Sequence, residues 1–121
     1  MGNYWDLKVW QLGMELAKSI YLLTQGFPTK EIYGLSSQMQ RAAVSIPTNL
    51  AEGRSRDSTK EFMHHVSIAQ GSLAELETEL QIAEFLKYGD QIKISELLEK
   101  CAEERRMLGG LLESLKSKLK P

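Results

Sequence analysis

Residues 35–53 read Leu-Ser-Ser-Gln-Met-Gln-Arg-Ala-Ala-Val-Ser-Ile-Pro-Thr-Asn-Leu-Ala-Glu-Gly, and this segment is the most informative about the architecture. Its apolar residues recur every three or four positions, which is the spacing of an amphipathic helix. They are Leu35, Met39, Ala43, Ile46 and Leu50. Pro47 lies inside this pattern, where it removes one backbone hydrogen bond and crowds the carbonyl group four residues earlier. We therefore expect one helix that starts near Ser36 and is kinked at Pro47.

The other side of this predicted helix is polar. It carries Gln38, Ser45, Asn49, Glu52 and Arg56. Exposure to solvent would explain such a face. The short side chains of Ser45 and Asn49 also suit a face that is pressed against another helix and hydrogen-bonded to it, either in a polar network of the core or at a subunit interface. The candidate assembly and packing residues are Ser45, Pro47, Asn49 and Glu52.

Two further helices flank this segment. The first is expected to have Asp6 as its N-cap and to stop at Gly26-Phe27-Pro28. Its apolar seam is predicted at Leu7, Trp10, Met14, Ala17, Tyr21 and Thr24. The helix after the segment begins with a capping box, Ser58 with Glu61, and stops at Gly89. Its stripe is Phe62, Val66, Ala69, Leu73, Leu76, Leu80 and Ala83. Such a helix would be roughly 45 Å long, which suggests that another subunit covers part of it.

The last predicted helix has a less regular stripe. Its apolar positions are Ile94, Leu98, Cys101, Leu108, Leu112, Leu115 and Leu119. Arg105 occupies a seam position, and Gly109-Gly110 follow it. Each interior glycine costs about 1 kcal/mol relative to alanine, and close helix packing is the simplest explanation for the pair. Four amphipathic helices with short connections predict an all-α, antiparallel up-down four-helix bundle, with residues 1–121 as a single domain.

The composition narrows the class of protein. The chain has 121 residues and a net charge of −1, which argues for one soluble domain and against a protein that coats nucleic acid by bulk charge. Cys101 is the single cysteine, so no internal disulfide is possible, as in a reducing cytoplasm. The sequence has no apolar run of about eighteen residues and no basic segment followed by an apolar core at its start. We expect a cytoplasmic protein with no membrane association.

The search for catalytic motifs gives one weak pattern. Glu61-Phe62-Met63-His64 is a Glu-x-x-His, the motif that di-iron bundles use twice. The two histidines, His64 and His65, are adjacent, so one chain cannot supply a second motif, although symmetric subunits could contribute one each. A solvated or hydrogen-bonded pair of histidines is the simpler interpretation. We therefore expect no enzyme, no catalytic residue, no metal and no cofactor.

Basic residues cluster in two places. Arg54, Arg56 and Lys60 flank one connection, offset only by Asp57 and Glu61. The C-terminal part carries Arg105, Arg106, Lys116, Lys118 and Lys120. Some of this charge complements a helix dipole, but a phosphate-binding surface is the more specific interpretation, and a ring of subunits would strengthen it by avidity. The candidate nucleic-acid contacts are Arg41, Arg54, Arg56, Lys60, Arg105 and Arg106.

Residues 35–53, with Arg56 and Ser58-Thr-Lys-Glu-Phe62 after them, resemble the 23S ribosomal RNA intervening-sequence protein family, also called the S23 or four-helix-bundle protein family. The likeness covers nearly the whole chain. The resemblance implies a four-helix bundle that assembles into a homopentameric ring, and a bacterial gene often found inside inserts of 23S rRNA genes. It also implies kinship with the accessory protein of diversity-generating retroelements, a basic pentamer that binds nucleic acid and a reverse transcriptase. This chain differs from that branch in being slightly acidic.

These observations predict a non-enzymatic, pentameric bundle protein that binds ribosomal RNA or another structured nucleic acid. The alternative is a protein-interaction scaffold whose partner is another, unidentified protein. Nuclease treatment separates the two, because a protein partner would stay bound after it.

Overall fold

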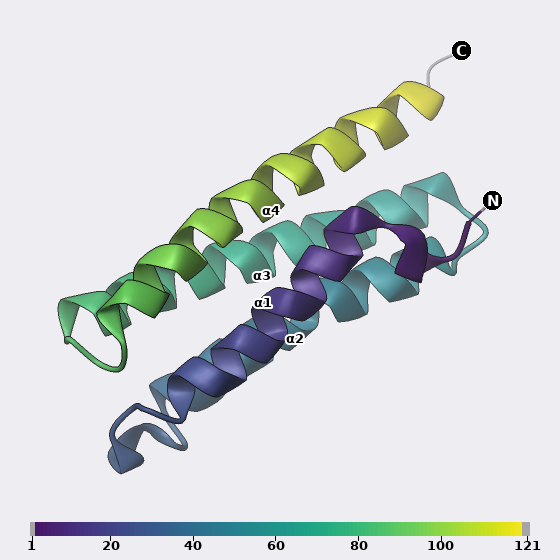
Figure 1. Ribbon diagram of the computed structural model, residues 1–121. Helices are drawn as coiled ribbons and strands as arrows, with labels where there is room; N and C mark the ends of the chain where they lie inside the picture. Colours follow the sequence, from purple (N-terminus) through teal and green to yellow (C-terminus); the bar gives the residue numbers. More distant parts are fainter. Residues whose placement is uncertain (1, 120–121) are drawn as a thin grey trace.

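The computed structural model describes residues 2–119, and its regular structure in that range is entirely helical. Four long helices alternate in direction and pack as an up-down bundle (Figure 1). They are α1 (Lys8–Thr24), α2 (Leu35–Arg54), α3 (Thr59–Phe85) and α4 (Gln91–Lys118). Two short 3-10 helices, η1 (Tyr4–Asp6) and η2 (Thr29–Glu31), precede α1 and α2. The fold class predicted from the sequence is confirmed.

One continuous apolar core holds the four helices together. Each helix contributes aliphatic side chains that are almost completely buried: Leu16, Ile20, Met39, Ile46, Leu50, Val66, Leu73, Leu76, Leu80, Ile94 and Leu108. Burying one side chain of this size stabilises a protein by about 1.5–3 kcal/mol. α2 and α3 share the most extensive contact, and α1 and α4 touch least among neighbouring helices. The α2–α3 pair is therefore the best-packed part of the bundle.

α3 follows its predicted pattern. All seven residues of its predicted stripe are buried. Ser58 is the N-cap, and its side chain accepts a hydrogen bond from the Glu61 backbone N–H at 3.2 Å. The helix ends at Phe85, a little before the expected stop, and Gly89 follows with a φ of 70°. A Cβ at Gly89 would lie 2.8 Å from Cε1 of Phe27, so both the backbone conformation and the packing require glycine there.

The predicted seam of α1 is only partly right: Thr24 is buried and Leu7, Trp10 and Ala17 pack against the core, but two positions face solvent. Met14 and Tyr21 are 47% and 48% exposed. The buried face instead carries Val9, Leu12, Gly13, Leu16, Ile20, Leu23 and Thr24. Apolar residues occur on both sides of this helix, so two stripes with a spacing of three and four residues compete. The compact aliphatic stripe is the one that faces the core.

The predicted N-cap of α1 is wrong. Asp6 belongs to η1, where its Oδ2 accepts a hydrogen bond from the Asn3 backbone N–H at 3.3 Å. Leu7 takes the N-cap position of α1, without a side-chain cap.

α2 lies where it was expected. It begins at Leu35 and continues as one helix through Pro47 to Arg54. The kink at Pro47 stays a prediction.

In α4, the structure corrects part of the predicted stripe and the explanation of the glycine pair. Leu119 is 44% exposed, and Leu97 is buried whereas Leu98 is only partly so. Glu104, not Arg105, faces the core, and it is 0% exposed. Both positions fit the spacing between Cys101 and Leu108, so periodicity cannot choose between them. A carboxyl group can become neutral by binding a proton, whereas a guanidinium cannot lose its charge in a protein. A Cβ at Gly109 or Gly110 would meet no atom of another helix within 4 Å, so no close packing among residues 2–119 explains the pair.

Candidate functional site

A chain of hydrogen-bonded side chains joins α2 to α3. Ser72 donates from its hydroxyl to that of Ser45 at 2.7 Å. The amide nitrogen of Asn49 donates to the Ser45 carbonyl at 2.9 Å and to its hydroxyl at 3.0 Å. The Asn49 amide oxygen lies 3.0 Å from Nδ1 of His65. Because an amide oxygen can only accept, the His65 proton in this contact is on Nδ1. We call these four residues the polar seam.

The four candidate assembly residues have different surroundings. Ser45 and Asn49 belong to the polar seam and bond to α3 of their own chain. Pro47 is buried, and its Cδ lies 3.5 Å from the position that a Cβ of Gly13 would occupy. Glu52 is exposed, with its carboxylate 3.9 Å from Nδ1 of His65. Of the alternatives for this face, the polar network within the chain is present, and the role of these residues in assembly stays a prediction.

Gly53 lets α2 and α3 approach each other just before their connection. A Cβ there would lie 2.7 Å from Cβ of His65 and 2.9 Å from Cδ1 of Phe62. Those distances are too short for two carbon atoms, so a larger residue would push the helices apart. The glycine therefore fixes the geometry of the connection that follows it.

Three cations gather at this connection, and we call Arg54, Arg56 and Lys60 the basic turn. Arg56 and Lys60 are exposed, and Arg54 is half-buried with its guanidinium 6.0 Å above the ring of Phe62. An open hollow lies beside them, lined by Ala51, Glu52, Ser55 and Arg56. The basic turn presents positive charge on a rigid support at one end of the bundle.

The other three candidate contacts lie elsewhere. Arg41 is exposed on α2, about 20 Å along the helix from Arg54 at 1.5 Å per residue. Arg105 forms an ion pair with Glu77 of α3, and Arg106 is exposed on α4. The single chain therefore does not bring the six predicted residues together. In the C-terminal cluster, Lys116 pairs with Glu113 at 3.4 Å, and Lys120 lies outside the described residues.

The Glu-x-x-His pattern lies on the surface of α3. Glu61 and His64 are both exposed, and the His64 ring packs edge-on against that of His65, with 5.8 Å between their centroids. Within residues 2–119, no three His, Cys, Asp or Glu side chains come close enough to hold a metal ion together.

Glu104 is an unusual residue that sequence reasoning missed. Neither oxygen of its carboxyl group has a hydrogen-bond partner among the described residues, and Oε2 lies 3.1 Å from the Cβ position of Gly13. Burial, with a smaller effect of Glu103, raises the pKa of Glu104 to about 8. The carboxyl group therefore stays largely protonated and neutral at pH 7. Gly13 leaves space for it, because a Cβ at that position would crowd the carboxyl oxygen at 3.1 Å.

Cys101, one turn before Glu104, does not have the properties of a nucleophile. Its thiol is buried, and this burial, followed by the nearby Glu77 and Glu104, raises its pKa to about 12. Nucleophilic cysteines react as thiolates. Cys101 thus acts as a small apolar residue of the core.

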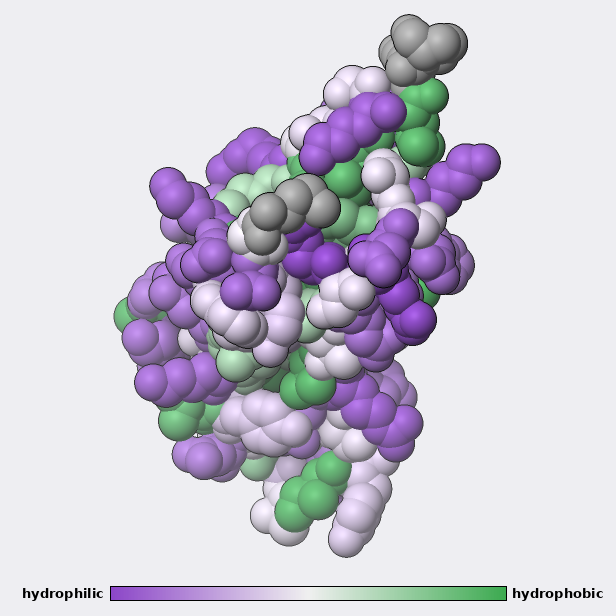
Figure 2. Space-filling model, turned by 90° about the vertical axis from the view of Figure 1, so that its right-hand side faces the viewer, coloured by the Kyte–Doolittle hydropathy of each residue, from purple (hydrophilic) through white to green (hydrophobic). Residues whose placement is uncertain are grey.

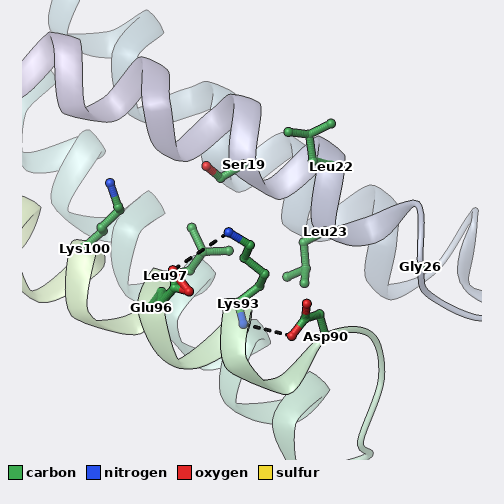
Figure 3. Close-up of a pocket in the computed structure, with 9 residues that line it drawn as sticks. All are labelled: Ser19, Leu22, Leu23, Gly26, Asp90, Lys93, Glu96, Leu97 and Lys100. Carbon is green, nitrogen blue, oxygen red and sulfur yellow. Dashed lines mark hydrogen bonds and ion pairs between the residues drawn. The ribbon is translucent and has the colours of Figure 1, made fainter.

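A groove of about 480 Å³ lies between the C-terminal half of α1 and the N-terminal half of α4. Figure 3 shows Leu23 and Leu97 pointing into it, while Lys93 reaches across below α1. The Lys93 ammonium is 3.9 Å from Glu96, and its backbone N–H donates to Asp90 at 3.2 Å. Positive and negative groups alternate along this groove, so it has no strong preference for ligands of either charge.

Apolar side chains are exposed at the end of the bundle that holds the α1–α2 and α3–α4 connections. Tyr33 is 97% exposed, Phe85 85% and Ile92 74%. The two connections are tied together, because the Tyr88 hydroxyl donates to Glu31 at 3.0 Å. Figure 2 shows a small apolar area at the lower tip of this face, and a larger one toward its upper end. We call the end with the two connections the apolar end. None of the described helices combines the length and hydrophobicity that crossing a bilayer requires.

Comparison with known families places the fold and these features in context. The family model for the 23S rRNA-intervening sequence protein matches residues 5–110, which include the polar seam, the basic turn and Glu104. The chain belongs to the 23S rRNA-intervening sequence protein family. A comparison with curated proteins gives no match.

Among solved structures, this intervening-sequence family member is similar to a protein of unknown function from the S23 ribosomal protein family of Bacteroides thetaiotaomicron. The two chains are 20% identical, with a TM-score of 0.77 over 86% of this chain and 97% of the other. At that identity the likeness shows the shared bundle fold. The family resemblance seen in residues 35–53 is confirmed by the family model.

Proposed function

We propose that this intervening-sequence protein is a non-enzymatic, pentameric bundle that binds ribosomal RNA or another structured RNA through its basic turn. The observation that carries the proposal is the placement of Arg54, Arg56 and Lys60 at one connection. That connection is held between the Gly53 contact and the Ser58 N-cap, so the backbone that carries these cations has a defined geometry. A defined backbone lowers the conformational entropy that is lost when the side chains bind phosphate groups.

A ring of subunits is what makes this proposal physically reasonable for a chain of net charge −1. Three cations on one chain make a weak phosphate site, because non-specific binding grows with the number of phosphates neutralised. Five copies around one axis would present five basic turns to one RNA molecule. Linked sites of this kind gain avidity without any new contact.

RNA binding should therefore depend strongly on salt and on the basic turn. We expect the affinity for a structured hairpin RNA to fall linearly with salt on a log–log scale, as counterions return to the phosphates. The double variant Arg56→Gln/Lys60→Gln should bind more weakly and show a shallower slope. Fluorescence anisotropy from low to physiological salt measures both quantities.

The matched control is Lys18→Gln/Lys30→Gln, which removes the same charge from exposed positions away from the basic turn. This control should keep the slope and most of the affinity. Two results would reject the proposal: no RNA binding at low salt, or equal loss in both double variants.

A protein-interaction scaffold is the second candidate function, and the apolar end favours it. Exposed aromatic side chains such as those of Tyr33 and Phe85 are typical of protein interfaces. A partner that remains bound after nuclease treatment, and that is lost in Phe85→Ser, would support the scaffold. Recovery of RNA but no protein would favour the RNA-binding function.

A further inference from the structure

A hollow of about 280 Å³ lies between α2 and α3, outside the basic turn. Its lining comes from both helices: Gln38, Arg41, Ala42 and Ser45 from α2, and Ser72, Glu75 and Glu79 from α3. The hydrogen bond from Ser72 to Ser45 joins the helices at this hollow. The space is several times the volume of roughly 30 Å³ that one water molecule takes in the liquid. It can therefore hold a small organic group.

Glu79 has no partner in this hollow. The residue is only 8% exposed, and its Oε1 atom is buried without a hydrogen-bond partner in the described part of the chain. Glu75 lies one turn earlier on the same face of α3, and its charge adds to the effect of burial in raising the pKa of Glu79. No ion pair within 4 Å joins Arg41 to either acid among residues 2–119. A buried, unpaired carboxyl group next to a second acid is unfavourable unless a cation or a proton neutralises it.

The lining selects for a particular class of ligand. Two carboxyl groups exclude an anion. The Gln38 amide oxygen and the hydroxyl group of Ser72 add acceptors that can receive N–H hydrogen bonds, whereas the Ser45 hydroxyl already accepts from Ser72 and Asn49. With both acids ionised, Glu75, Glu79 and Arg41 give the lining a formal charge of −1, which one monovalent nitrogen cation would neutralise.

We propose that this hollow binds a cationic nitrogen group, an ammonium or a guanidinium, with Glu79 and Glu75 as its counterions. The group has two possible sources with the same chemistry. One is a free amine of the polyamine type, and the other is a Lys or Arg side chain of a second copy of this chain. In both cases the cation neutralises the charge of Glu79 and Glu75, which no basic side chain of residues 2–119 offsets within 4 Å.

The first arm of the test uses free amines. Spermidine and agmatine are titrated into the full chain by calorimetry at constant ionic strength, with MgCl2 as the metal comparison. Glu79→Gln keeps the shape of the side chain, and its amine affinity should fall more than about tenfold, as expected when one partner of a buried charge pair is removed. Glu84→Gln removes the same charge from an exposed position on α3 and should leave the affinity unchanged. Arg41→Gln removes a competing positive charge and should tighten amine binding.

The second arm tests a side chain from another copy. Sedimentation velocity at several protein concentrations should then show self-association that Glu79→Gln weakens, that Glu84→Gln preserves and that spermidine competes against. The proposal is overturned if neither amine binding nor self-association depends on Glu79. It is also overturned if Mg²⁺ binds at Glu79 as tightly as the amines do. Neither arm contains RNA, so the result is independent of the proposed RNA binding.

Discussion

The carboxyl group of Glu104 makes the stability of the bundle depend on pH. Its pKa is near 4.5 when exposed and about 8 in the folded chain, because burial disfavours the charged form. Below pH 4.5 the group is protonated in both states, and its contribution to stability is fully present. As pH rises from there toward 8, the unfolded chain releases the proton while the folded chain keeps it. Stability is therefore lost with rising pH through this window, by about 1.4 kcal/mol per pH unit.

Replacing this carboxyl group should remove much of that dependence. Glu104→Met fills a similar volume without a titratable group, so its free energy of unfolding should exceed that of the wild type at pH 8. Between pH 5 and pH 8 its stability should change less than that of the wild type. Glu79, whose pKa burial also raises, adds a residual dependence in the same direction.

Urea unfolding at pH 5, 6.5 and 8 measures both effects. Glu99→Gln, at an exposed position on the same helix, serves as the control and should follow the wild type. Parallel curves for Glu104→Met and the wild type would contradict the assignment of a neutral, buried carboxyl.

At the scale of the helix, the contact between α2 and α3 depends on Gly53. Gly53→Ala places a methyl group against His65 and Phe62, and overpacking of this kind costs typically about 1–3 kcal/mol. Gly71→Ala is the matched control on α3, because a Cβ there would meet no atom within 4 Å. That change should stabilise the protein by up to about 1 kcal/mol through helix propensity. Chemical denaturation of both variants gives the comparison, and equal shifts would argue against the close approach.

The helices also differ in how well their faces could be predicted. α3 carries one unbroken apolar stripe, and the structure buries all of it. α1 has apolar residues on both sides, so periodicity alone selected Met14 and Tyr21, which are half-exposed. In α4 the spacing allowed both Glu104 and Arg105, and the choice rests on whether the side chain can become neutral at neutral pH.

The same limit applies to the candidate site. The sequence indicated that Ser45 and Asn49 suit a packed polar face, and both bond to α3. Their partners His65 and Ser72 could not be predicted, because they depend on the register in which α2 meets α3. The unpaired Glu79 depends on that same register, as does the burial of its carboxyl group. Helix periodicity therefore predicts most of the fold, whereas most of the site depends on how the helices pack against each other.

At the scale of the whole molecule, assembly is the property that the proposed RNA binding needs most. We expect native mass spectrometry to give a species with five times the 13.7 kDa mass of one chain. The exposed aromatic residues of the apolar end and the uncovered Gly109 and Gly110 of α4 leave surface for contacts between copies. A monomer at every concentration would contradict the ring, and avidity could then not support RNA binding.

The up-down topology has a practical consequence for handling the protein. The first turn of α1 and the last turn of α4 lie at the same end of the bundle as the α2–α3 connection (Figure 1). A bulky tag, or attachment to a sensor surface, beside either of these two helix turns would therefore lie at the same end as the basic turn and leave the opposite end accessible. Probes for RNA experiments belong near Ser95, at an exposed position close to the far connection. Immobilisation through a terminus suits a search for protein partners instead.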